Sequence, residues 1–210
     1  MTAFITHCWK SGRLDRLLQH GLGWLVLWVA GLAHAQSAAD ITQFRVERAE
    51  DDIQVSAQIQ FELPGAVEDA LLKGIPMYFV AEADVLRERW YWYDKKLANV
   101  ERHMRLAYQP LTRHWRLNVS TGPGNANSQG LVLNQGFDTL PQALAGIKRV
   151  SNWKIVDVAD LDPGLKYKIE FRFRLDLSRL PRPFQIGAIG QADWDVSAVA
   201  SAPLSPELVK

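Results

Sequence analysis

The sequence contains a single cysteine, Cys8, which lies near the start of the chain. An intramolecular disulfide is therefore excluded, and a domain formed from residue 36 onward is cysteine-free and depends on packing for its stability. Only two histidines, His103 and His114, lie in that part, and they lack the spacing of a zinc site. Gly-x-Ser-x-Gly and Gly-Lys-Ser/Thr motifs are also missing. The sequence thus predicts no metal site and no cofactor, and its motifs identify no catalytic residue.

An excess of charge of one sign is lacking as well. The chain balances 24 lysines and arginines against 23 acidic residues, for a net charge of +1. Removal of residues 1–35 would change this to −1, because that segment carries Lys10, Arg13 and Arg16 against Asp15. Such a balanced chain has no global field to attract nucleic acid or anionic lipid. We therefore expect no nucleic acid as a partner.

The first 35 residues have the features of a secretory signal peptide. Basic residues precede the apolar stretch Gly21–Ala33, and Ala33-His34-Ala35 places small side chains at the cleavage site. An uncleaved membrane anchor is the alternative, but 13 apolar residues span as a helix only about 20 Å of roughly 30 Å of bilayer hydrocarbon. We therefore predict cleavage after Ala35, export to a bacterial periplasm, and no stable membrane anchor in the mature chain.

Alternation of apolar and polar residues predicts antiparallel β-structure. The odd positions of Ile53–Phe61 are apolar and the even ones polar, and the same alternation runs through Lys166–Leu177. Side chains two apart share a face of a strand, and one polar face is typical of antiparallel sheets. Weaker patterns predict further strands near 41–48, 76–93, 98–108, 112–119, 152–158 and 189–199, with helices over 65–73 and 139–149.

These patterns predict one domain over residues 36–199, an antiparallel β-sandwich with two short helices. Residues 120–136, rich in Gly, Asn and Ser, are expected to form a long loop. The two prolines of Leu180–Phe184 favour a stiff, extended crossover that Phe184 pins to the core. Residues 200–210 are expected to form a loose tail.

A short motif adds detail to the predicted sandwich. Leu161, Pro163, Gly164 and Tyr167 have the spacing Leu-x-Pro-Gly-x-x-Tyr. This resembles the tyrosine corner of fibronectin type III and related immunoglobulin-like domains, where the tyrosine hydroxyl bonds back to the turn backbone. The alternating strand begins at Tyr167, as this interpretation requires. The resemblance implies an immunoglobulin-like character for the fold.

Residues 89–94, Arg-Trp-Tyr-Trp-Tyr-Asp, have the most unusual composition of the chain. On a strand, the aromatic pairs would face opposite ways, with Trp90 and Trp92 on one side and Arg89, Tyr91 and Tyr93 on the other. One pair is then expected in the core. The other pair is either an exposed platform for sugar rings or a protein partner, or a second buried layer. Burial is favoured, because large aromatic side chains mostly pack.

A basic group forms the second candidate binding surface. In the predicted strand 112–119, alternation leaves two basic side chains pointing outward, His114 and Arg116. The neighbouring strand would add Arg105 or His103, which gives a positive stripe suited to an acidic partner or an anionic headgroup. The alternative, which is favoured, is a solvated face whose charges pair with acids such as Glu101.

Several segments together carry a family resemblance: residues 89–94, 106–108, 112–117, 137–144, 175–185 and 193–194. They resemble an exported bacterial family catalogued only as a domain of unknown function, number 4390. Members are typically labelled proline-rich or exported proteins, and their genes often neighbour a two-component sensor kinase. The resemblance implies an envelope location and a signalling accessory role, and it supplies no catalytic residues.

Three hypotheses for function follow. The first is a periplasmic binding or accessory module that uses the aromatic segment and the neighbouring basic face to hold an envelope protein. The second is an envelope enzyme acting on glycan through Asp or Glu, which requires two carboxylates lining one pocket beside the aromatic residues. The third is a structural envelope protein without a defined small-molecule site. The oligomeric state has no signature in the sequence.

Overall fold

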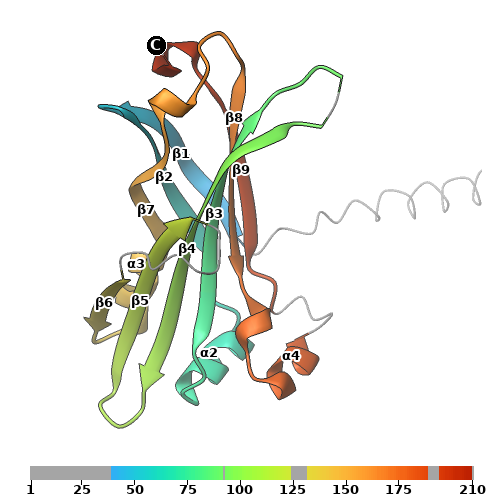
Figure 1. Ribbon diagram of the computed structural model, residues 1–210. Coiled ribbons are helices and arrows are strands. Elements are labelled where there is room, and N and C mark those ends of the chain that lie inside the picture. The colour runs from blue at the N-terminus through green and yellow to red at the C-terminus, as the bar shows by residue number, and fades with distance from the viewer. Residues whose placement is uncertain (1–38, 92, 124–131, 189–193, 210) are drawn as a thin grey trace, which may run out of the picture. The chain divides into compact units, whose positions relative to one another are not determined.

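The computed structural model describes residues 39–91, 93–123, 132–188 and 194–209. Within these residues the protein is mainly β, with two antiparallel sheets and three α-helices (Figure 1). The smaller sheet has the strand order β1 (Ala39–Ala49), β2 (Asp52–Phe61) and β7 (Arg149–Asp157). The larger sheet has the order β6 (Val132–Phe137), β5 (His114–Pro123), β4 (Lys95–Gln109), β3 (Met77–Arg87), β8 (Tyr167–Leu175) and β9 (Ser197–Leu204).

The two strongest sequence patterns become β2, the central strand of the smaller sheet, and β8, which lies between β3 and β9 in the larger sheet. Every odd position of β2 is buried, and so is every odd position of β8, as alternation predicts. The helices α2 (Gly65–Leu72) and α3 (Leu140–Lys148) confirm the two predicted helices within a residue or two. In α3 a proline occupies the first turn, and Ala143 and Ile147, four residues apart, face the core.

Aromatic side chains join the two sheets into one core. The ring of Phe61 on β2 lies 5.7 Å from Phe79 on β3 and 5.4 Å from Phe173 on β8. On the same strand β8, the Phe171 ring lies 5.9 Å from Phe44 of β1 and 6.4 Å from Trp153 of β7. The apolar side chains on the inner faces of the two sheets therefore pack together in one core.

The strand predicted over 76–93 was wrong at its end. β3 stops at Arg87, which pairs with Tyr167, the first residue of β8, and with Lys95, the first residue of β4. Beyond Arg87 the chain has no neighbouring strand with which to continue the β8 ladder. Lys95 and Lys96, which lie between the predicted strands 76–93 and 98–108, instead begin β4.

Three other segments also differ from the expectation. The predicted long loop is shortened by β5, which runs to Pro123, and by β6; residues 124–131 lie outside the described part. The predicted strand at 189–199 starts only at Ser197, with residues 189–193 not described, and continues into the supposed tail as β9 to Leu204. The predicted extended crossover, Leu180–Phe184, instead runs into the helix α4 (Arg182–Ala188). Prolines are tolerated in the first turn of a helix. Phe184 packs against the core, as expected.

Residues 1–38 lie outside the described part, so the predicted leader and its cleavage site stay predictions. Within the described residues, no helix has both the length and the apolar character that a membrane span requires.

Candidate functional site

The aromatic loop, residues 88–94, connects β3 to β4. Its described aromatic side chains are almost fully accessible: Trp90 is 93% exposed, Tyr91 70% and Tyr93 88%. Trp92 lies outside the described residues. The favoured expectation of burial was therefore wrong for these three side chains. It rested on a strand that ends at Arg87, so the alternation that assigned faces does not reach them.

Polar contacts fix the base of this loop. The Arg89 N–H donates to Asp94 Oδ1 at 3.4 Å, which joins the two ends of the loop. Asp94 Oδ2 lies 3.4 Å from Lys168 Nζ on β8, and the Glu88 N–H donates to the Lys166 carbonyl at 3.0 Å. At the tip, the Trp90 and Tyr91 rings meet edge to face with centroids 5.1 Å apart. The loop therefore presents exposed rings on a base that is tied to the sheet.

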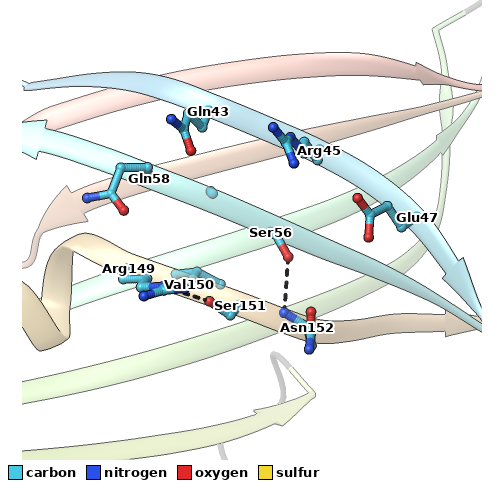
Figure 2. Close-up of a pocket in the computed structure, with 10 residues that line it drawn as sticks. Gln43, Arg45, Glu47, Ser56, Gln58, Arg149, Val150, Ser151 and Asn152 are labelled. Carbon is cyan, nitrogen blue, oxygen red and sulfur yellow. Dashed lines mark hydrogen bonds between the residues drawn. The ribbon is translucent and has the colours of Figure 1, made fainter.

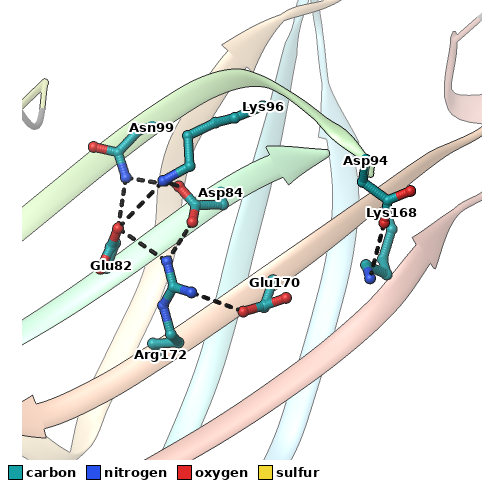
Figure 3. A network of polar contacts seen from close by, with 8 residues as sticks. All are labelled: Glu82, Asp84, Asp94, Lys96, Asn99, Lys168, Glu170 and Arg172. Atoms are coloured by element: carbon teal, nitrogen blue, oxygen red, sulfur yellow. Dashed lines mark hydrogen bonds and ion pairs between the residues drawn. The ribbon is translucent and has the colours of Figure 1, made fainter. Parts of the chain in front are cut away.

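Next to this base, the outer face of the larger sheet carries an acidic pair on β3, of which one member is buried. Asp84 is only 1% exposed, and Glu82 precedes it on the same face. Figure 3 shows the cationic and amide side chains that converge on the pair from β4 and β8. Lys96 Nζ lies 2.7 Å from Asp84, and the Asn99 amide donates to both acids, at 2.9 Å and 2.7 Å.

Arg172 is the second cation of this network. Its guanidinium contacts Asp84, lies 3.1 Å from Glu82 and lies 2.9 Å from Glu170. Burial opposes the charged form, but the hydrogen bond to Glu82 and the neighbouring carboxylates raise the pKa of Arg172. The guanidinium therefore stays charged at every physiological pH. Both acids of the pair form ion pairs with Lys96 and Arg172, and these pairs link neighbouring strands of the sheet. The two carboxylates therefore do not provide the free acid and base that glycan hydrolysis requires.

The predicted basic stripe exists but lies elsewhere on the sheet. Arg105, His114 and Arg116 are exposed on the outer face of β4 and β5, where Ala107 pairs with Arg116 and Gln109 with His114. Arg105 follows Lys95 by ten residues, which is about 33 Å along a strand. The stripe is therefore not a neighbour of the aromatic loop, and the expectation of one joint surface was wrong. Figure 1 shows the two ends of β4 well apart.

The histidines of this region pair with acids. His103 Nε2 lies 3.1 Å from a Glu101 oxygen, as the solvated-face alternative expected, and His114 Nδ1 lies 3.1 Å from Asp138 Oδ1. Within the described residues, neither Arg105 nor Arg116 has an ion pair. No group of three or more potential metal ligands occurs in the described part of the chain.

The residues of the predicted tyrosine corner come together at the start of β8. The buried Tyr167 hydroxyl accepts a hydrogen bond from the Asp162 N–H at 2.9 Å. Gly164 has a φ of +89°, a backbone conformation that favours glycine. Leu161 is buried beneath the turn that Pro163 opens. This corner fixes the entry into the strand that carries Lys168 and Arg172.

The charged network beside the loop was not predicted from the sequence. A signal was present in β8, where Lys168, Glu170 and Arg172 alternate in sign along one face. The partners of Arg172 on β3 lie about 90 residues earlier, and only the register of β3 with β8 brings Glu82 opposite Arg172.

The architecture is that of a mainly β protein with two antiparallel sheets, an exposed aromatic loop and a paired charged face. The family described as Domain of unknown function (DUF4390) matches residues 36–202, and the chain belongs to this family. The resemblance drawn from the sequence is thus confirmed. No curated protein and no solved structure matches the chain.

Proposed function

We propose that this chain is an exported binding module that engages an envelope protein through the aromatic loop. The observation that carries the proposal is the exposure of Trp90, Tyr91 and Tyr93 on a loop with an ordered base. Tryptophan and tyrosine dominate the energetics of protein interfaces, and an accessible aromatic cluster is a typical docking feature. The leader-like segment and the family's exported members support an envelope location.

The charges around the loop define the chemistry of the partner. Asp94 is neutralised by Lys168, and Lys96 by Asp84. Arg89 and Lys95 are exposed cations at the two ends of the loop, against the exposed acid Glu88. A partner with an apolar pocket for the Trp90 ring, bordered by acidic side chains, complements this arrangement. The anchored base lowers the entropy lost on binding, because fewer backbone torsions need to be fixed.

The two alternatives have less support. A glycan hydrolase needs a free acid and base in one pocket, whereas Glu82 and Asp84 on the adjoining face are paired with Lys96 and Arg172. Asp94 of the loop base is paired with Lys168. A purely structural role gives no reason to hold several large aromatic rings in solvent.

For the fold, we propose an immunoglobulin-like β-sandwich. The order β1-β2-β7 corresponds to strands A, B and E of a variable-type domain, and β5-β4-β3-β8-β9 corresponds to C″, C′, C, F and G. The corner tyrosine, Tyr167, stands at the start of the strand equivalent to F, which supports this correspondence. In it, β6 is an additional edge strand. An experimental structure with β2 paired to any strand of the larger sheet would contradict the assignment.

The binding proposal is tested by photocrosslinking in the cell of origin. A photoreactive phenylalanine derivative replaces Trp90, Tyr91 or Tyr93 in turn, and adducts are identified by mass spectrometry. Leu111 is the matched control, because it is a fully exposed apolar residue in the turn between β4 and β5. We expect one envelope protein to be captured from the loop positions and not from position 111.

The variant Trp90→Ala supplies the energetic side of this test. We expect at least about 30-fold weaker binding to the captured protein, with stability changed by less than about 0.5 kcal/mol because the side chain is exposed. Absence of adducts, or the same adducts from position 111, would refute the proposal. Capture of glycan alone would replace the protein partner by a sugar.

A further inference from the structure

The smaller sheet carries a polar recess on its outer face, on the other side of the core from the charged network. Its volume is about 300 Å³, and all three strands of the sheet contribute to its lining (Figure 2). Figure 2 shows side chains of β1 on one side of Ser56 and side chains of β7 on the other. None of the residues lining it belongs to the aromatic loop or to the basic stripe.

The recess exists because a small residue stands among long ones. Ser56, on the central strand, lies opposite Arg45, and the next outward residue, Gln58, lies between Gln43 and Arg149. The pairing of β2 with β7 shifts at this point, so that β7 has two residues where β2 has only Ser56. The long side chains thus surround Ser56, which forms the floor of the recess.

The floor of the recess is held in place by the bulge. Asn152 has a φ of +47°, a left-handed conformation that asparagine tolerates better than most residues. Its N–H donates to Ser56 Oγ at 3.1 Å. The serine oxygen is thereby fixed as an acceptor, and its own O–H is available to donate into the recess.

The charge of the recess is positive. The guanidinium groups of Arg45 and Arg149 are both exposed, and neither forms an ion pair within the described residues. Arg149 Nε donates to Ser151 Oγ at 3.3 Å, which orients the group and leaves its two terminal nitrogens without a partner among the described residues. Glu47 is the single acid in the lining, so two cations face one carboxylate.

We propose that this recess binds the oxyanion group of a small ligand, a carboxylate or a phosphate, between Arg45 and Arg149. Guanidinium groups donate paired hydrogen bonds that match the oxygens of such groups. The Ser56 hydroxyl and the amides of Gln43 and Gln58 donate to the remaining oxygens or to sugar hydroxyls. This site is separate from the aromatic loop and does not depend on its function.

The test follows the Nε–Hε resonances of the arginines by NMR while the purified protein is titrated. The probes are inorganic phosphate and D-glucuronate, added separately at an ionic strength held constant with chloride. We expect saturable shifts at Arg45 and Arg149, and at least a tenfold loss of affinity in Arg45→Met and in Arg149→Met. Arg48→Met is the matched control, because Arg48 on the same strand lies outside the lining.

A second variant separates a shaped site from general surface charge. Ser56→Leu fills the floor and keeps both guanidinium groups, and we expect it to lose binding as the arginine variants do. The arginine variants alter exposed side chains and keep the fold, so the test remains decisive even if Ser56→Leu unfolds. Saturation by phosphate alone or by glucuronate alone identifies the ligand class. Saturation by neither probe, or arginine variants that bind as tightly as the unmodified protein, would overturn the proposal.

Discussion

Asp84 is the residue with the least expected environment, because it is buried on the outer face of a sheet. Its cover consists of side chains, since Lys96 and Arg172 extend over it from the two neighbouring strands. A carboxylate removed from water costs free energy unless charged or hydrogen-bonding groups replace the water. Here two cations and the Asn99 amide do so. Removal of one of these partners is therefore expected to cost stability.

We predict that Arg172→Met destabilises the protein by about 3 kcal/mol, because it leaves a buried carboxylate with fewer partners. Lys96→Met is the matched comparison, and its cost is about 1 kcal/mol, since the lysine side chain is half exposed. Urea denaturation followed by circular dichroism measures both.

A double variant completes this cycle. Asp84→Asn combined with Arg172→Met removes the buried charge together with its partner and recovers at least about 1 kcal/mol relative to Arg172→Met alone. A double variant as unstable as the single one would show that Arg172 acts through packing and not through Asp84.

The burial of a side chain could be predicted only where the alternation within its own strand determines it. The alternation of β2 and β8 identified their core residues correctly. The burial of Asp84 depends on side chains from β4 and β8, which no local pattern reveals. The exposure of Trp90 depends on where β8 begins, because that residue sets the end of the β3 ladder.

At the scale of elements, β9 shows how a neighbour can impose structure. Its sequence, Ser-Ala-Val-Ala-Ser-Ala-Pro-Leu, has weak alternation and small side chains. It nevertheless pairs without a register shift along β8, from Ser197 opposite Arg174 to Leu204 opposite Tyr167. β8 provides a strongly patterned edge, and strand preference depends on such neighbours more than on the segment itself. The same reason explains why β6, with almost every side chain exposed, was missed.

We predict that a chain ending at Val199 is much less stable than one ending at Leu204. The missing residues include the buried Leu204, which contributes about 2 kcal/mol, and ladder hydrogen bonds worth about 1 kcal/mol each. The midpoint of thermal unfolding should therefore fall by at least about 10 °C. The chain ending at Leu204 is the control, since both lack the residues that follow β9. Equal midpoints would mean that residues 200–204 form a loose tail after all.

At the scale of the whole molecule, Phe171 couples the two sheets. Its ring contacts Phe44 on one edge strand of the smaller sheet and Trp153 on the other, while its backbone belongs to the larger sheet. The antiparallel, mainly β class was predictable from sequence because alternation is local. The strand order was not, because pairings such as β2 with β7 join segments about 100 residues apart.

We predict that Phe171→Ala lowers the free energy of unfolding by about 3–5 kcal/mol. Because one core serves both sheets, unfolding should remain a single transition, and native-state hydrogen exchange should quicken equally in β2 and β4. Phe44→Ala, at a partly exposed position, is the milder comparison. Loss of protection confined to the larger sheet would show that the sheets unfold independently.

The strand order also determines when each sheet can be completed as the chain folds. One neighbour of β2 is β7, and one neighbour of β3 is β8, and both neighbours come much later in the chain. Both sheets are therefore completed only by the last third of the chain. Until then the hairpin β1–β2 and the meander β3–β4–β5–β6 each have an open edge on a strand that will become central. Unpaired edges of this kind invite pairing with other chains. A chain synthesised from its amino end therefore passes through a stage at which it is prone to aggregation. This stage ends when β8 pairs with β3.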